Sequence, residues 1–222
     1  MRESRLFYFS VEGETEKWYL DWLRDGINKS IETKFNAKFD CKIEKDPLSR
    51  AKGMSILGKT EIAHIFDRES EEPIHQKQFT TTLERMKEAQ KIGKNLQYTL
   101  GYSNFSFDLW ILLHKADCNG PLDYRHQYLS LLNRAFQEQF SKMDAYKKED
   151  NFKRLLGKLS LNDVWAAIGR AKKIQVQNIE RGYVLCQHCG YEYYKGNPSL
   201  SIWQVVEKIL IQCGMPSVNT NF

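Results

Sequence analysis

Residues 7–16 read FYFSVEGETE and set the architecture of this chain. The apolar run at 7–11 predicts a buried strand, Gly13 predicts a turn, and Thr15 marks the entrance to a helix. That order places Glu12 at the carboxyl end of the first strand, the edge of an open α/β sheet where ligands bind. The alternative is a strand, a turn and a capped helix with solvated carboxylates, because acidic residues are common in the first turn of helices.

Beyond this segment, predicted strands alternate with predicted helices. Such alternation indicates βαβ units and an α/β fold with a mostly parallel sheet flanked by helices. Further strands are expected at residues 38–44, 61–66 and 96–102, and further helices at 81–91 and from Asn104 onward.

The composition describes a protein with a substantial core and a mild positive charge. Hydrophobic residues make up 41% of the 222 residues, and Lys plus Arg exceed Asp plus Glu by five (33 − 28). This excess permits contact with nucleic acid without requiring it. The five cysteines are scattered and odd in number, unlike a disulfide framework. Without a signal peptide or an apolar run long enough to cross a bilayer, we expect a cytoplasmic protein with no membrane partner.

The pattern changes at Pro121. From there to about residue 171 the sequence is helical and rich in Lys and Arg, and a last helix carries an apolar stripe from Ile202 to Leu210. We therefore predict an α/β core at 1–120 and a mainly helical region at 121–222 packed on it. A solvated helical face explains the basic residues better than a surface that tracks phosphates.

Residues 53–60, GMSILGKT, match the P-loop pattern G-x-x-x-x-G-K-[ST]. A working P-loop needs a strand before it and a helix after it, so that backbone N–H groups cradle the phosphates. Here no strand precedes the motif and a strand follows it, so we interpret it as a flexible loop.

Cys186 and Cys189 are spaced like half of a zinc site. Structural zinc needs four ligands, and only His188 or the distant Cys213 could supplement the pair. The sequence therefore argues against zinc and favours two thiols in a tight turn.

Acidic and amide side chains follow three of the predicted strands. Glu12 follows the first strand, Asp67 and Glu69 follow the strand at 61–66, and Asn104 with Asp108 follows the strand at 96–102. Because parallel strands share a carboxyl edge, we expect these side chains to converge. The three carboxylates nearest the strands would form a hard-oxygen site suited to Mg²⁺, with Mn²⁺ as the alternative, for phosphodiester cleavage. His114 lies on the apolar face of its helix, which favours a core histidine over a catalytic one.

Four segments, taken together, resemble the RloB family. They occur in the family's order and span most of the chain, which makes the resemblance more specific than any one motif. The segments are VEGETE at 11–16, FDRE at 66–69, SNFSFDLWILLH at 103–114 and NPS at 197–199.

This resemblance implies a fold, a chemistry and a context. The family includes AbiLii-like abortive-infection proteins and looks like a divergent Toprim fold, in which a glutamate performs acid–base chemistry and a pair of aspartates holds Mg²⁺. Carried over, this implies Glu12 as an acid–base or metal residue, Asp67 and Glu69 as metal ligands, and Glu16 as a further catalytic candidate. The second motif would contribute Ser103, Asn104, Asp108 and His114.

Three residues depart from the family pattern. Glu69 stands where aspartate is usual, Phe105 replaces a proline, and Asp108 replaces a glutamate. The longer arm of Glu69 would shift a metal position.

Three functions are consistent with these features. We favour a Mg²⁺-dependent nuclease acting on DNA or RNA, the effector of an antiphage abortive-infection system. The alternative is a non-catalytic partner or regulatory subunit of a P-loop ATPase, which the resemblance implies is encoded nearby. A nucleotide-binding switch built on the loop at 53–60 is the weakest of the three.

Overall fold

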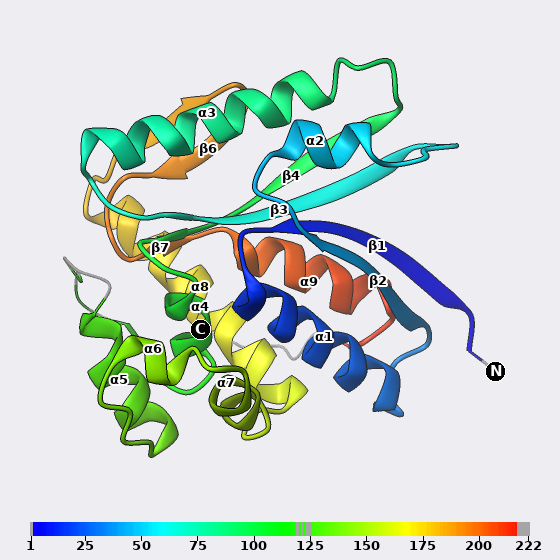
Figure 1. Cartoon of the computed structure of the whole chain (residues 1–222). Coiled ribbons are helices and arrows are strands. Elements are labelled where there is room, and N and C mark those ends of the chain that lie inside the picture. Colours follow the sequence, from blue (N-terminus) through cyan, green and yellow to red (C-terminus); the bar gives the residue numbers. More distant parts are fainter. Residues whose placement is uncertain (1, 119, 121, 123–125, 217–222) are drawn as a thin grey trace.

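The computed structural model describes residues 2–118, 120, 122 and 126–216. These residues form a central sheet, a separate hairpin and the helices around them (Figure 1). The strands are β1 (Ser4–Val11), β2 (Asn36–Ile43), β3 (Thr60–Arg68), β4 (Leu96–Asn104), β5 (Leu185–His188), β6 (Tyr191–Tyr194) and β7 (Ser199–Leu200). The helices are α1 (Glu14–Lys29), α2 (Pro47–Lys52), α3 (Pro73–Ala89), α4 (Asp108–Leu113), α5 (Gln127–Phe136), α6 (Met143–Tyr146), α7 (Glu149–Leu156), α8 (Leu161–Glu180) and α9 (Ile202–Gln212).

The five-stranded sheet has the order β2-β1-β3-β4-β7. Its first four strands are parallel, and β7 runs antiparallel to β4. The strands predicted around residues 5–11, 61–66 and 96–102 therefore lie side by side in one sheet. The predicted α/β fold with a mostly parallel sheet is confirmed.

Helices cover both faces of this sheet (Figure 1). α1, α4, α8 and α9 pack on one face around Val11 and Ile65, whereas α2, α3 and the β5–β6 hairpin cover the other face around Ile62 and Phe66. The helix that leaves β1 and the helix that leaves β3 thus lie on opposite faces and lead toward opposite edges. This arrangement makes the β1–β3 boundary a topological switch point, where α/β proteins form a crevice beyond the carboxyl ends of the strands.

Local sequence explains how two of the helices begin. Ser160 and Asp163 form a capping box at the start of α8, each side chain bonded to the backbone N–H of the other. The unexpected α2 also carries a start signal, because Asp46 accepts a hydrogen bond from the Leu48 N–H at 3.1 Å and Pro47 occupies the first turn.

The second half of the chain is mainly helical, as predicted, but it also supplies three short strands that we did not expect. β7 extends the central sheet, and β5 pairs with β6 through a turn in which Cys189 and Gly190 have φ values of 53° and 88°. Two consecutive positive φ angles are the signature of the type I′ turn that joins tight hairpins. The predicted boundary near residue 120 stays a prediction, and Pro121 lies outside the described residues.

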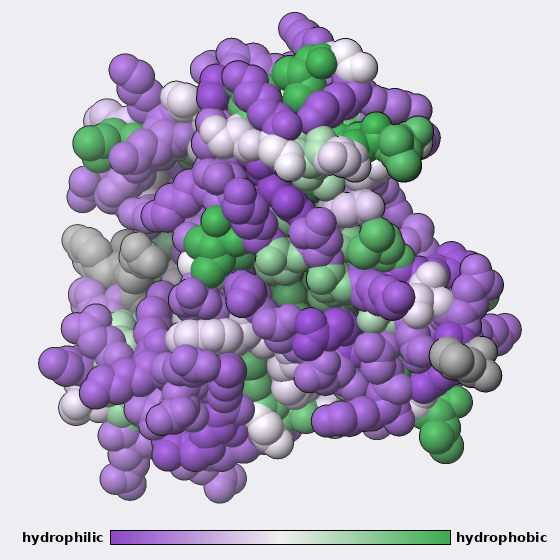
Figure 2. Space-filling view, turned by 45° about the vertical axis from the view of Figure 1, so that its right-hand side comes forward, coloured by the Kyte–Doolittle hydropathy of each residue, from purple (hydrophilic) through white to green (hydrophobic). Residues whose placement is uncertain are grey.

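The surface is mostly polar. On the face shown in Figure 2, hydrophilic side chains predominate and apolar ones form small, separate groups. No helix within the described residues is both long enough and apolar enough to span a membrane.

Candidate metal centre at the carboxyl edge of the sheet

Glu12 and Asp67 meet at the switch point. Glu12 directly follows β1, and its Oε2 accepts a hydrogen bond from the backbone N–H of Asp67 in β3 at 3.0 Å. Asp67 alternates with Phe66 and Arg68, so its side chain projects to the same face of the sheet as Ile65, which is the α1 face. The structure therefore brings these two predicted site residues to one point.

Glu16 lies one helical turn behind them and is only 5% exposed. Burial raises the pKa of its carboxyl group, and the negative charge of Glu12 raises it further, whereas its own backbone N–H and Lys147 lower it. Thr15 donates a hydrogen bond to its Oε2 at 3.2 Å. Gly13 lets the carboxylate fold back over the start of α1, because a Cβ at Gly13 would lie 3.3 Å from that oxygen.

Glu69 has a different partner. Its Oε2 lies 3.4 Å from Nε2 of His75 in α3, and Nδ1 of that histidine is 2.7 Å from Ser70 Oγ. Within the described residues, no three His, Cys, Asp or Glu side chains gather into a group that could hold a metal ion. Glu12 thus contacts Asp67, whereas Glu69 contacts His75 of α3.

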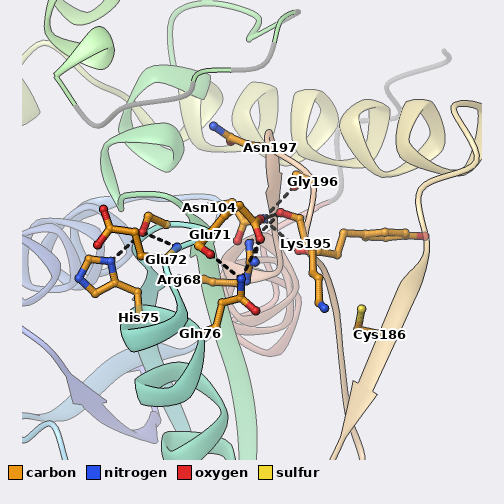
Figure 3. Close-up of polar contacts among 12 residues, drawn as sticks. Arg68, Glu71, Glu72, His75, Gln76, Asn104, Cys186, Lys195, Gly196 and Asn197 are labelled. Atoms are coloured by element: carbon orange, nitrogen blue, oxygen red, sulfur yellow. Dashed lines mark hydrogen bonds and ion pairs between the residues drawn. The ribbon is translucent and has the colours of Figure 1, made fainter.

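Asn104 of the second motif holds the β6–β7 loop at the carboxyl edge of the sheet. Asn104 is fully buried, and its Nδ2 lies 2.9, 3.1 and 2.8 Å from the carbonyl oxygens of Tyr194, Lys195 and Gly196 (Figure 3). Arg68, 1% exposed, donates to the Lys195 carbonyl and to Glu71, both at 2.7 Å. These bonds hold the β6–β7 loop on the carboxyl ends of β3 and β4.

Asp108 belongs to a buried group of charged and polar side chains on the α1 face. Its Oδ2 accepts a 2.6 Å hydrogen bond from Ser106 and lies 3.4 Å from Nζ of Lys147. The phenol of Tyr146 and Oδ1 of Asp108 are buried, and neither has a hydrogen-bond partner among the described residues. Burial and the nearby charges of Asp108 and Glu16 raise the pKa of Tyr146 well above its usual value.

His114 is a core residue. Its Nδ1 lies 2.9 Å from the Trp110 carbonyl oxygen, its Nε2 lies 3.1 Å from the Tyr19 hydroxyl, and it is 1% exposed. Because a carbonyl only accepts, Nδ1 carries the proton and Nε2 accepts from Tyr19. Burial lowers the pKa of His114 to about 4, so the ring is neutral at pH 7.

Buried histidines make stability depend on pH. Burial also lowers the pKa of His64 to about 3, and the unfolded chain takes up these protons near pH 6.5. The unfolded state then binds more protons than the native state, so the free energy of unfolding should fall as pH drops from 6.5 toward 4. Each neutral histidine contributes about 1.4 kcal/mol per pH unit.

This prediction can be checked by urea unfolding at pH 7 and pH 5. His114→Phe should reduce the loss of stability between the two pH values, whereas the same change at the exposed His126 should leave it as in the parent protein. An unchanged loss in His114→Phe would contradict a neutral buried ring.

The P-loop pattern at 53–60 has the reverse of the required order. The short helix α2 precedes it and the strand β3 follows it. Because β3 and not a helix follows Lys59, the motif offers no helix N-terminus to bind a phosphate.

Cys186 lies in β5 and Cys189 in the hairpin turn. The expectation of no zinc at these cysteines stays a prediction.

Six of the nine Lys and Arg residues between residues 140 and 175 have acidic partners. Ion pairs at 2.5 to 3.5 Å neutralise them, which favours a solvated helical face over a surface that tracks phosphates. The pairs are Lys147–Asp108, Lys153–Glu149, Arg154–Glu138, Lys158–Glu138, Arg170–Asp117 and Lys172–Glu207.

Comparison with protein-family models identifies one match, to the family described as RloB-like protein, over residues 7–209. The chain belongs to the RloB family. The matched region starts inside β1 and ends inside α9, so RloB membership covers the sheet, the site and the helical part. Neither the curated proteins nor the solved structures include a match to the chain. RloB membership is consistent with a role in defence.

Sequence reasoning missed several residues at this RloB site. Lys147 and Tyr146 lie close to Asp108 and Glu16 but outside the family segments, and Arg68, on the opposite face of the sheet, holds the β6–β7 loop. Arg68 could have been noticed in the sequence, because it is a charged residue at the end of an apolar strand. Lys147 is one of many lysines in its region, and only its position in the folded structure distinguishes it.

Proposed function

We propose that this RloB protein is a Mg²⁺-dependent nuclease with a Toprim-like fold, the effector of an antiphage abortive-infection system. The observation that carries the proposal is the hydrogen bond between Glu12 and the Asp67 N–H, which joins two carboxylate residues at the switch point of a parallel sheet. Ligand sites of α/β proteins lie at such points.

The chemistry of these residues suits a magnesium ion. Mg²⁺ is commonly held by one or two carboxylates and keeps several waters, so Glu12 and Asp67 suffice as protein ligands. Burial and the negative charge of Glu12 raise the pKa of Glu16, and a nearby cation would offset both effects. Glu69 would join as a third ligand by turning away from His75.

Asp67 and Glu12 would have different roles in the cleavage of a phosphodiester. Asp67 would hold the cation, and Glu12 would hold it or accept the proton of the attacking water. Bound Mg²⁺ would polarise the phosphoryl oxygen and lower the pKa of that water. Lys147 lies 3.4 Å from Asp108, and its charge also lowers the pKa of Glu16, so this lysine balances two buried carboxylates.

The proposed substrate is DNA or RNA, reached in the cytoplasm and together with a P-loop ATPase encoded nearby. The excess of five positive charges supports contact with a polyanion. Most of the Lys and Arg residues between residues 140 and 175 form ion pairs with acidic residues. Binding of nucleic acid would therefore depend more on the crevice at the carboxyl edge of the sheet than on the helices of this region.

One observation favours the alternative, a non-catalytic regulatory subunit of the ATPase. Glu69 contacts His75, and the described residues gather no group of three metal-ligating side chains. In that case the carboxyl edge would serve as a binding surface.

A nuclease assay separates the two functions. Purified protein is incubated with single- and double-stranded DNA and RNA in Mg²⁺, in Mn²⁺ and in EDTA, alone and with the neighbouring ATPase. Cleavage that requires the divalent ion, in either setting, supports the nuclease. No cleavage in any setting, with stable binding to the ATPase, would establish the regulatory subunit instead.

A further inference from the structure

Strand β4 forms an edge of the parallel sheet that is covered along only part of its length. β7 pairs with Ser103 and Asn104. Ser201 covers the next step, because its N–H donates to the Tyr102 carbonyl at 2.9 Å and its hydroxyl bonds the Tyr102 N–H and the Leu100 carbonyl at 3.1 and 2.9 Å. Among the described residues, no strand pairs with the rest of β4, back to Leu96, on that side.

The uncovered part presents backbone hydrogen-bonding groups outward. Peptide groups alternate along a strand, so Tyr98 and Leu100 face the same side as Tyr102, whereas Gln97 and Thr99 face β3. The N–H of Leu100 and both backbone groups of Tyr98 therefore point away from the sheet. None of the described residues makes a hydrogen bond to these three groups.

A groove of about 460 Å³ lies against this edge. The hairpin residues Tyr191 and Tyr193 line one side of it, and Gln175 of α8 and Gln204 of α9 line the other. Figure 1 shows β6 and α8 on opposite faces of the sheet at this end. Two layers thus flank the unpaired part of β4, whose residues Tyr98 and Leu100 are 3% and 7% exposed, and the groove lies between these layers.

We propose that this groove binds an extended segment of a partner polypeptide, which adds to β4 as a strand. Outward N–H and C=O groups that recur at every second residue are complementary to the backbone of another strand, the arrangement known as β-augmentation. Because the edge is recessed between two layers, a slender segment reaches it and the flat edge of a second folded sheet does not.

The side chains of the groove define the chemistry of that segment. Its lining holds one lysine, Lys87, and one glutamate, Glu192, so a segment without net charge matches it. Leu185 of β5 lines the groove and is 46% exposed, and this exposure calls for an apolar side chain on the partner. This binding surface is separate from the carboxylates and does not depend on the proposed catalysis.

The test begins with the whole protein and a phage-displayed library of random twelve-residue peptides. We expect selection of uncharged peptides with apolar residues at alternate positions. A synthetic peptide of the selected sequence should slow amide exchange at Tyr98 and Leu100 by about tenfold or more. The amides of Gln97 and Thr99 are the internal control, because β3 already protects them.

A matched pair of variants tests the location. Gln175→Trp narrows the groove and should weaken peptide binding by about tenfold. Gln177→Trp, on the same helix but outside the groove, should leave binding unchanged. The proposal is overturned if no peptide is selected, or if bound peptide leaves exchange at Tyr98 and Leu100 unaltered. Protection of these amides that rises with protein concentration alone would assign the edge to a second copy and overturn it equally.

Discussion

Asp67→Ala is expected to lower Mg²⁺-dependent cleavage by about 10³-fold or more while the protein stays folded, since removing a ligand disables the metal's role. The alanine keeps the backbone N–H that Glu12 accepts, so the link between β1 and β3 survives. Without metal, the variant should be as stable as the parent or slightly more so, because one of several neighbouring negative charges is gone. Cleavage assays and urea unfolding, each with and without Mg²⁺, measure both effects.

Glu72→Gln is the control for charge. It removes one exposed carboxylate from the loop after β3, so activity should stay within about twofold of the parent. Glu12→Gln should lose activity like Asp67→Ala, with a smaller change in Mg²⁺ affinity if Glu12 moves a proton. Full activity and an unchanged Mg²⁺ response in Asp67→Ala would refute the metal centre.

Asn104→Ala should destabilise the protein by about 2–4 kcal/mol, because the Tyr194 and Gly196 carbonyls lose their donor and a cavity forms, whereas the Lys195 carbonyl keeps Arg68. The amide is the contact that holds three successive carbonyls of the β6–β7 loop. Urea unfolding gives the change in the free energy of unfolding. Limited proteolysis should show new cleavage between residues 185 and 200.

Asn151→Ala provides the matched comparison. Its amide donates to a single carbonyl, that of Ala145, at 2.7 Å in a half-buried position, so the same substitution should cost about 1 kcal/mol. If both variants lost the same free energy of unfolding, and Asn104→Ala showed no new cleavage near the loop, the bonds from Asn104 would not stabilise the loop more than one ordinary hydrogen bond does.

Much of this fold follows from local patterns. Apolar runs ending in Glu12, Asp67 and Ser103 predicted three parallel strands, and all three occupy one sheet with their carboxyl ends together. The meeting of Glu12 with Asp67 was predictable for the same reason, because parallel strands share an edge.

The rest depends on contacts that no local pattern encodes. β7 is two residues long, and its pairing partner lies about a hundred positions earlier, so periodicity had nothing to detect. The pairing of Glu69 with His75 arises from the loop geometry before α3. Lys147, directly after α6, approaches Asp108 at the start of α4, and the tertiary fold sets this contact rather than the sequence spacing.

The loop clamped by Asn104 has a consequence for synthesis on the ribosome. Its anchor lies some 90 residues upstream of the carbonyls that it holds, and α9, which packs against β4, follows later still. A nascent chain can pair β1, β3 and β4 early, but this edge of the sheet closes only after nearly the whole polypeptide has emerged. A chain released prematurely would therefore carry Glu12 and Asp67 without the completed edge of the sheet around them.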